Sequence, residues 1–402
     1  MKKITMIITA LMITGNMFSQ TNTWVALTSG ITTNLLGVSD VSSRICYAVG
    51  NAGVVLKTIN GGITWVAQTS GTSNNLYSVC FTDSLHGVAV GDVGTIIRTI
   101  NGGTTWSSIS ATTNDLRNIS FYDANTGYTV GGVSGVSGSV FKTIDGGATW
   151  NQQTIASTNG MYSIKFTSST TGYCSDETGA IFMTINGGTN WSLLTSGTTN
   201  ALYLMDFPTT TNGVIVGNNG TIVRTVNGGT SWSTINSGTT NLICGLKFIN
   251  VNYGFAVGGN VGANTGSILE TNDGGNNWFI NSPSTPLLYR VDFANVNVGF
   301  AVGFNGTILK YTSNVGINEN ENNVSCNIYP NPSTGKFEIV VNDKSNKKTI
   351  VNIFNNLGQL ISSEQTASNT ITIDLSNQSK GIYFAEIKTD EGITTKKIVL
   401  SE

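Results

Sequence analysis

Few residues of this 402-residue chain have the type and spacing that chemistry requires. Asp206 and Asp292 each precede a phenylalanine in a short apolar run, and a pair of carboxylates is what glycoside hydrolysis uses. Equivalent runs carry Lys165 and Lys247 at the same position. We therefore expect these four side chains to be opposite-charge neighbours, with two-carboxylate catalysis by Asp206 and Asp292 as the alternative.

The sequence lacks the residues that other catalytic and metal-binding sites require. The single histidine, His86, lies in a polar turn, which leaves a Ser-His-Asp triad or a histidine metal site without its central residue. We expect no cofactor and no bound metal. The cysteines are odd in number, scattered and inside apolar runs, which predicts buried free thiols at Cys46, Cys80, Cys174, Cys244 and Cys326.

A recurrent aromatic position is the main candidate for ligand binding. It lies near the start of the same apolar runs and is occupied by Tyr77, Tyr162, Tyr203 and Tyr289, with Arg117 at the equivalent place. Strand alternation puts Tyr77 on one face with Val79 and Phe81, so packing between repeats is the favoured interpretation. Recognition at the mouth of a channel is the alternative. Two glycine-rich loops, 131–138 and 258–266, could also contact a ligand, the second through Asn260 and Asn264.

A sequence repeat positions these residues. The seven tryptophans are Trp24, Trp65, Trp106, Trp150, Trp191, Trp232 and Trp278, spaced 41, 41, 44, 41, 41 and 46 residues apart. Six of them follow a turn of Asn or Asp and two glycines, in which the polar side chain folds back onto the turn's own amides. These structural turns contain Asn60, Asn101, Asp145, Asn186, Asn227 and Asp273. Three further short apolar runs separate successive tryptophans, which predicts four strands per repeat and a β-propeller.

The two ends of the array complete each other. The last repeat, at 288–312, has three strands and no Gly-Gly-x-x-Trp, whereas residues 23–28 form a tryptophan strand with no preceding partners. We expect residues 23–28 to be the outer strand of that last blade, which predicts a closed ring of seven blades.

The repeat resembles the BNR or Asp-box family, most closely propellers of the photosystem II assembly and stability factor type. The resemblance rests on Gly254-Phe-Ala-Val-Gly258 and Gly220-Thr-Ile-Val-Arg224-Thr-Val-Asn227-Gly-Gly-Thr-Ser-Trp232, and it covers about residues 21–313. BNR repeats also occur in sialidases, which need three converging arginines. This chain has five arginines in all, and Arg98 and Arg224 share a repeat position with lysines, so we interpret both as solubilising residues at strand ends. The resemblance implies a fold rather than an activity.

Composition and the chain start indicate export. Charged residues make up 10% of the chain and the formal net charge is -2, which argues against nucleic-acid binding. Lys2 and Lys3 precede an apolar stretch at 4–13 that is too short to span a membrane. We expect a signal peptide at 1–19, a propeller at 20–313, a linker at 314–324, a C-terminal domain at 325–402, and no transmembrane segment.

The C-terminal segment has a different composition and alternating strands that predict a small antiparallel β-sandwich of the Ig-like type. It resembles the type A sorting domain of the type IX secretion system. The matching residues are Tyr329, Pro330, Asn331, Pro332, Gly358, Gly381, Tyr383, Lys396 and Lys397. The resemblance implies a protein that reaches the cell surface or the medium through the periplasm, with the type IX machinery as partner.

Together these observations favour a monomeric, non-enzymatic surface protein that binds a glycan or a protein. A secreted polysaccharide-acting glycoside hydrolase is the alternative.

Overall fold

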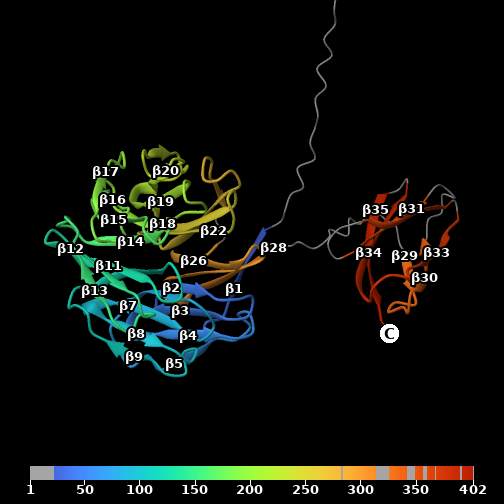
Figure 1. The fold of residues 1–402 in the computed structure, drawn as a ribbon, viewed down its shortest axis with the longest axis horizontal. Coiled ribbons are helices and arrows are strands. Elements are labelled where there is room, and N and C mark those ends of the chain that lie inside the picture. Colours follow the sequence, from blue (N-terminus) through green and yellow to red (C-terminus); the bar gives the residue numbers. More distant parts are fainter. Residues whose placement is uncertain are drawn as a thin grey trace, which may run out of the picture. The chain divides into compact units, whose positions relative to one another are not determined.

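The computed structural model describes residues 22–281, 284–313, 326–341, 349–355, 360–366, 368–389 and 392–401. The chain divides into two compact units between Ser313 and Asn314, and each is described by itself. Within the described residues all regular structure is β-strand apart from four short 3-10 turns, which confirms the predicted all-β class (Figure 1). The predicted signal peptide at 1–19 and linker at 314–324 lie outside the described residues.

The first unit contains, in its described residues, seven four-stranded antiparallel sheets, the number that a seven-bladed propeller needs (Figure 1). The inner strands are β2 (Leu35–Asp40), β6 (Leu76–Phe81), β10 (Leu116–Phe121), β14 (Met161–Phe166), β18 (Leu202–Asp206), β22 (Leu242–Phe248) and β26 (Leu288–Asn295). The second strands are β3 (Cys46–Gly50), β7 (Gly87–Gly91), β11 (Gly127–Val133), β15 (Gly172–Asp176), β19 (Gly213–Gly217), β23 (Gly254–Asn260) and β27 (Val298–Gly303).

The remaining two strands of each sheet follow in order. The third strands are β4 (Val55–Thr58), β8 (Ile96–Thr99), β12 (Ser137–Thr143), β16 (Ile181–Thr184), β20 (Ile222–Thr225), β24 (Thr265–Thr271) and β28 (Ile308–Ser313). The outer strands are β5 (Val66–Gln68), β9 (Ser107–Ile109), β13 (Asn151–Gln153), β17 (Ser192–Leu194), β21 (Ser233–Ile235), β25 (Phe279–Asn281) and β1 (Asn22–Leu27). The 3-10 turns join second to third strands and are η1 (Asn51–Gly53), η2 (Asp92–Gly94), η3 (Asn218–Gly220) and η4 (Phe304–Gly306).

A repeated Phe-Gly pair lets neighbouring strands and sheets pack closely. Phe81, at the end of β6, is the cross-strand partner of Gly87, and a Cβ on Gly87 would lie 2.5 Å from the phenyl ring. Glycine is therefore needed there, because any larger residue would displace the ring. Trp106 then packs edge-on against Phe81, with ring centroids 5.9 Å apart and planes at 88°. Six sheets carry the Phe-Gly pair, whereas the first sheet has Asp40 and Cys46 in the two positions.

The Asn-Gly-Gly turns are held by their own side chains. Oδ1 of Asn60 accepts hydrogen bonds from the Thr58 hydroxyl at 2.9 Å and from the Thr64 backbone amide at 3.0 Å. Gly61 and Gly62 have φ values of 69° and 87°, a region that glycine enters without steric cost. The turn thus fixes the chain direction that leads into the following tryptophan strand.

Basic side chains of the third strands tie five of the six such turns to the preceding sheet. Nε of Arg98 donates to the carbonyl of Gly146 at 2.8 Å, and Nε of Arg224 donates to the carbonyl of Gly274 at 2.8 Å. Nζ of Lys57 likewise donates to the carbonyl of Gly102 at 2.7 Å. The interpretation of Arg98 and Arg224 as solubilising residues at strand ends is therefore wrong, because each bridges two sheets.

The last sheet is completed by the first described residues. β1 pairs antiparallel with β28, with Trp24 opposite Tyr311. The Trp24 ring lies 5.3 Å from the Tyr311 ring and 6.0 Å from the Phe293 ring, centroid to centroid. The two ends of the propeller segment therefore close on each other, as ring closure requires.

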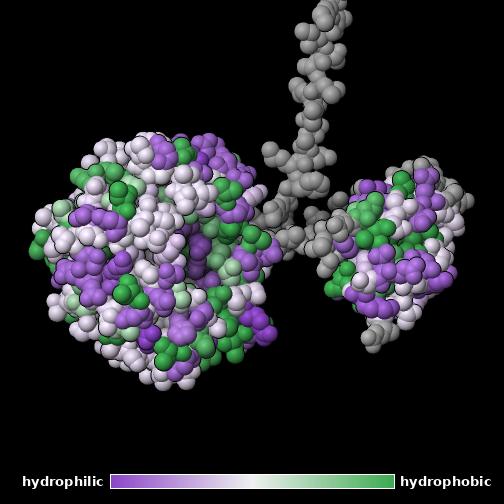
Figure 2. Space-filling model, in the orientation of Figure 1, coloured by the Kyte–Doolittle hydropathy of each residue, from purple (hydrophilic) through white to green (hydrophobic). Residues whose placement is uncertain are grey.

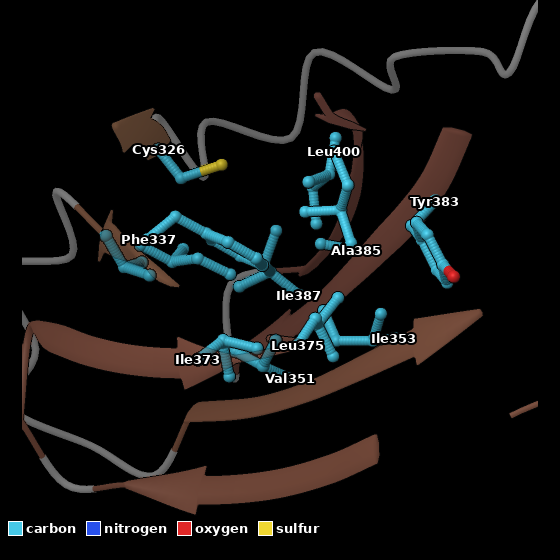
Figure 3. Packing of buried hydrophobic residues seen from close by; sticks show 13 residues of the cluster. Cys326, Phe337, Val351, Ile353, Ile373, Leu375, Tyr383, Ala385, Ile387 and Leu400 are labelled. Atoms are coloured by element: carbon cyan, nitrogen blue, oxygen red, sulfur yellow. The ribbon is translucent and has the colours of Figure 1, made fainter. Parts of the chain in front are cut away.

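The second unit consists of two antiparallel sheets that share one core. The first sheet contains β29 (Cys326–Tyr329), β30 (Lys336–Val341) and β33 (Thr370–Asp374). The second contains β32 (Leu360–Thr366), β31 (Thr349–Asn355), β34 (Gly381–Thr389) and β35 (Gly392–Leu400). Phe337 and Ile373 of one sheet meet Val351, Ile353 and Ile387 of the other (Figure 3). Alternate residues of each strand therefore point into the space between the sheets.

Asn331 links two distant parts of this unit. Its side-chain amide donates to the carbonyl of Lys397 at 2.7 Å, and its Oδ1 accepts from the amide of Val399 at 2.9 Å. The Tyr-Pro-Asn-Pro segment is thereby fixed to the last strand, 66 and 68 residues further along the chain. Gly358 lies outside the described residues.

Candidate binding site at the mouth of the central channel

A cavity of about 250 Å³, here called the mouth cavity, opens where the inner strands begin. Every one of the seven sheets contributes to it. Its lining residues are Leu36, Tyr77, Arg117, Tyr162, Tyr203, Leu242, Cys244, Tyr289 and Arg290. The space-filling view shows a hollow near the centre of the propeller unit with hydrophilic residues inside it (Figure 2). The five predicted residues of the recurrent aromatic position are thus brought together in one cavity.

A β-bulge explains why they face the channel. In β6 the register shifts between Leu76 and Ser78, so Tyr77 has no cross-strand partner, and all seven inner strands show the same shift at this place. A bulge inserts one extra residue and turns its side chain out of the regular alternation. The expectation that Tyr77 packs between repeats with Val79 and Phe81 is therefore wrong: Tyr77 lines the mouth cavity, whereas Val79 lies in the hydrophobic core.

In β22 this shift lies between Ile243 and Gly245. The extra residue of β22 is Cys244. This cysteine therefore lines the cavity at the position where four other sheets present tyrosine. Burial raises the pKa of the Cys244 thiol to about 11, so the thiol is neutral and contributes apolar surface to the cavity wall.

Aromatic rings and one guanidinium form one wall of the cavity. The Arg117 guanidinium lies 5.3 Å from the Tyr77 ring centroid and 5.5 Å from that of Tyr162. Tyr162 in turn meets Tyr203 edge-on, with centroids 4.9 Å apart. Nη2 of Arg117 also forms an ion pair with Asp115 at 3.1 Å. These contacts hold the rings in place before any ligand arrives, which reduces the entropy lost on binding.

Arg290 lines the mouth cavity and also a second cavity, here called the deeper cavity, which is lined by the later residues of the inner strands. Arg290 therefore lies where the two cavities adjoin. Its Nη1 donates to the backbone carbonyl of Cys244, which holds the guanidinium in place. Burial lowers the pKa of Arg290 from its ordinary value. The sequence analysis did not single out Arg290, because no residue type recurs at its position. The equivalent residues in three other sheets are Ser78, Asn118 and Ser163.

The two glycine-rich loops lie outside this cavity's lining. Asn260 and Asn264 belong to the turn between β23 and β24, and neither lines the mouth cavity. Oδ1 of Asn260 accepts from the amide of Ala263 at 2.8 Å, and Oδ1 of Asn264 accepts from the amide of Leu287 at 3.3 Å. Both side chains therefore stabilise the loop and its junction with the next sheet.

The deeper cavity, about 320 Å³, contains the charged residues singled out in the sequence. Lys165 pairs with Oδ1 of Asp206 at 3.2 Å, and Lys247 pairs with Oδ1 of Asp292 at 2.7 Å. The four side chains are thus opposite-charge neighbours around the channel, as the sequence indicates. Oδ2 of Asp206 accepts from the amide of Phe248 at 2.8 Å, which joins one inner strand to the next.

The electrostatics of Asp206 do not suit a catalytic acid. Burial alone would raise its pKa, but the ammonium groups of Lys165 and Lys247 lower it below the ordinary value. A general acid at neutral pH needs the opposite shift. Both oxygens of Asp206 are also engaged, one by an ammonium group and one by a backbone amide.

Two family models match the chain. Residues 67–193 match the model described as photosynthesis system II assembly factor YCF48, and residues 327–401 match the secretion system C-terminal sorting domain. The propeller thus contains a segment that resembles YCF48, and a C-terminal sorting domain follows the propeller. The sorting domain directs export by type IX secretion, so the protein is secreted or attached to the cell surface. In the described part of the chain, no helix has the length and apolarity that a membrane crossing requires.

Solved propellers resemble the first unit. YCF48 bound to a D1 peptide has a TM-score of 0.60 at 21% identity, covering 72% of this chain and 94% of the other. YCF48 from Cyanidioschyzon merolae has a TM-score of 0.58 at 19% identity, with 72% and 98% covered. The WD40 β-propeller domain of Doa1 has a TM-score of 0.59 at 13% identity, with 72% and 95% covered. At these identities the likeness establishes the propeller fold alone. No curated protein sequence matches the chain.

Proposed function

We propose that this exported protein is a non-enzymatic binding module that recognises a glycan or a protein at the mouth cavity of its propeller. The observation that carries the proposal is the cavity itself, to which all seven sheets contribute a side chain. Apolar and aromatic walls with a few fixed polar groups are typical of ligand sites. The tyrosines and Arg117 are held by one another, so the site is formed before binding.

The carboxylates of the deeper cavity support binding over hydrolysis. Asp206 and Asp292 are each paired with a lysine and each accept a backbone hydrogen bond from a neighbouring inner strand. Such contacts join sheets and engage both oxygens of Asp206 and of Asp292, so neither of these two carboxylates is free to donate a proton or attack a sugar. A glycoside hydrolase remains the second candidate function, because it is the activity that two channel carboxylates would serve.

A protein ligand has one supporting observation. A YCF48 propeller of similar fold was solved with a D1 peptide bound. The fold therefore accommodates a peptide in that protein, and a peptide belongs among the probes.

The test uses the full chain from residue 20 onward, applied to a glycan array and a peptide array, with a reducing-sugar release assay on the glycans that bind. Tyr162→Ala should weaken binding by about tenfold or more, because it removes an aromatic wall. The matched control is Tyr122→Ala, since Tyr122 is 43% exposed and outside the cavity. Sugar release that disappears in Asp206→Asn or Asp292→Asn would show the protein to be a hydrolase. Equal binding by wild type and Tyr162→Ala would place the ligand elsewhere.

A further inference from the structure

We infer that the mouth cavity takes the end of an acidic saccharide, with the carboxylate of its terminal sugar bound by Arg290; this rests on the proposed binding function of the same cavity. Arg290 lines both cavities, and its Nη1 is held by the backbone carbonyl of Cys244.

The charge of Arg290 is not matched by the protein. Among the described residues no carboxylate forms an ion pair with it, and its contacts are the carbonyls of Cys244 and Tyr289. Arg117, in the same cavity, differs because Asp115 neutralises it at 3.1 Å. A partly buried guanidinium without an acidic partner is costly, and an anion that enters the cavity would relieve this cost.

A single carboxylate fits better than a more highly charged anion. One guanidinium offers a flat pair of donors that matches the two oxygens of a carboxylate. Three acidic side chains, Asp92, Asp115 and Glu177, stand near the rim and would repel a dianion. Each is already engaged: Asp92 by Tyr77 and Asn75, Asp115 by Arg117, and Glu177 by the amide of Gly160.

A cationic ligand is disfavoured although tyrosines surround the opening. The Arg117 guanidinium already lies over the rings of Tyr77 and Tyr162, so a ligand cation at these rings would meet a like charge. A second cation there would also face Arg290 across a small space.

The size and the walls favour a sugar at a chain end. A volume of about 250 Å³ holds one small ring with its substituents, which suits the terminal sugar of a chain better than several consecutive sugars. Tyrosine rings offer flat faces for the C–H side of a pyranose, and their hydroxyls both donate and accept as sugar hydroxyls do. A peptide carboxyl terminus is more often held by consecutive backbone amides, whereas this cavity is lined by side chains from seven strands.

The test measures binding of oligosaccharides that end in glucuronate, galacturonate or sialate, each beside the same oligosaccharide with its carboxyl group reduced to an alcohol. At least one acidic probe should bind about tenfold or more tightly than its reduced form, the effect of a lost charge-assisted contact. Arg290→Gln should remove this preference, so that the acidic probe and its reduced form bind with similar affinity. Arg290→Lys should retain part of it, because lysine keeps the charge without the paired donors.

Arg44→Gln is the control, because Arg44 is an exposed arginine in the turn after β2 and does not line either cavity. Thermal unfolding of each variant shows whether it folds, and if Arg290→Gln does not, the comparison of Arg290→Lys with wild type decides. Equal affinity for acidic and reduced probes, or an acidic preference that survives in Arg290→Gln, would overturn the inference. So would Arg290-dependent binding of peptide carboxyl termini with none of the saccharides. Absence of binding to every glycan and peptide would instead overturn the proposed function.

Discussion

The backbone amide of Asp40 donates a hydrogen bond to Oδ2 of Asp292 at 2.9 Å, across the seam where the first complete sheet meets the last. In return, Oδ2 of Asp40 accepts from the amide of Ala294 at 3.1 Å. Oδ1 of Asp40 is buried and has no hydrogen-bond partner. Asp40 occupies the position that is phenylalanine in the other six sheets, so the closing seam carries a polar contact where the others are apolar.

Asp40→Asn should stabilise the propeller, and increasingly so as the pH rises from about 4 to about 8. Burial, reinforced by the nearby Asp292 charge, raises the pKa of Asp40 from 3.8 to about 8, although Lys247 and Lys310 act against this. Because the folded-state pKa is above the unfolded one, the contribution of Asp40 to stability is complete below pH 4 and is lost as the pH approaches 8. Asparagine cannot ionise and still accepts from Ala294. The gain in unfolding free energy at pH 8 should be on the order of 2 kcal/mol.

Urea unfolding at several pH values measures the difference in unfolding free energy between Asp40→Asn and the wild type. Asp123→Asn is the matched control, because backbone hydrogen bonds lower the pKa of exposed Asp123, so its effect should be constant from pH 5 to 8. If the difference in unfolding free energy between Asp40→Asn and the wild type does not change with pH, then Asp40 is ionised in the folded protein throughout this range.

Val93→Asn should also stabilise the propeller. Val93, in η2, has a φ of 53°, and the equivalent positions in η3 and η4 are Asn219 and Asn305, with φ of 52° and 55°. A β-branched residue in this region is strained, whereas asparagine tolerates it. Val93 is 61% exposed, so little packing is lost. We expect a gain of about 1 kcal/mol in unfolding free energy. The reverse substitution, Asn219→Val, should cost a similar amount; no change in either variant would show that the turns relax.

The regular part of the fold was predictable from sequence because it repeats. Each Asn-Gly-Gly turn requires positive φ at two glycines, and each tryptophan needs a buried phenylalanine beside it, so a pattern such as Gly61, Gly62 and Trp65 determines where strands begin and end. Trp24 without its own turn indicated that the chain ends meet, and β1 does pair with β28.

The candidate site was only partly predictable. The tyrosine position was visible as a repeat, but its direction depends on a bulge, and a bulge is set by hydrogen-bond register between strands rather than by residue type. Arg290 and Asp40 are single departures from the repeat, and their roles arise from contacts with Cys244 and Asp292 in neighbouring sheets. A position-by-position comparison of the inner strands would have marked Asp40, the one residue that replaces phenylalanine.

Removal of residues 21–29 should destabilise the propeller by opening its last sheet. The deletion removes β1 and the Trp24 ring, which packs 5.7 Å from the ring of Phe255 and 5.3 Å from that of Tyr311. It also exposes the edge of β28, which can then pair with another chain. We expect a lower melting temperature and aggregation, measured by calorimetry and light scattering. Trp24→Ala should show a smaller loss, and Val25→Ala, at a position 52% exposed, almost none. An unchanged melting temperature after the deletion would contradict ring closure by β1.

Truncation after Ser313 should leave a folded propeller in the periplasm of the native host. The two units have separate hydrophobic cores, so the propeller can fold without the sorting domain, but the signal peptide alone carries it only across the inner membrane. Fusion of residues 314–402 to a fluorescent reporter with a signal peptide should bring the reporter to the surface or the medium, while the signal peptide alone should not. Cell fractionation and blotting measure both, and we expect the exported product to lack the tail. Normal amounts of truncated protein outside cells whose outer membrane is intact would show that the propeller carries its own export signal, because nothing else would remain to direct it.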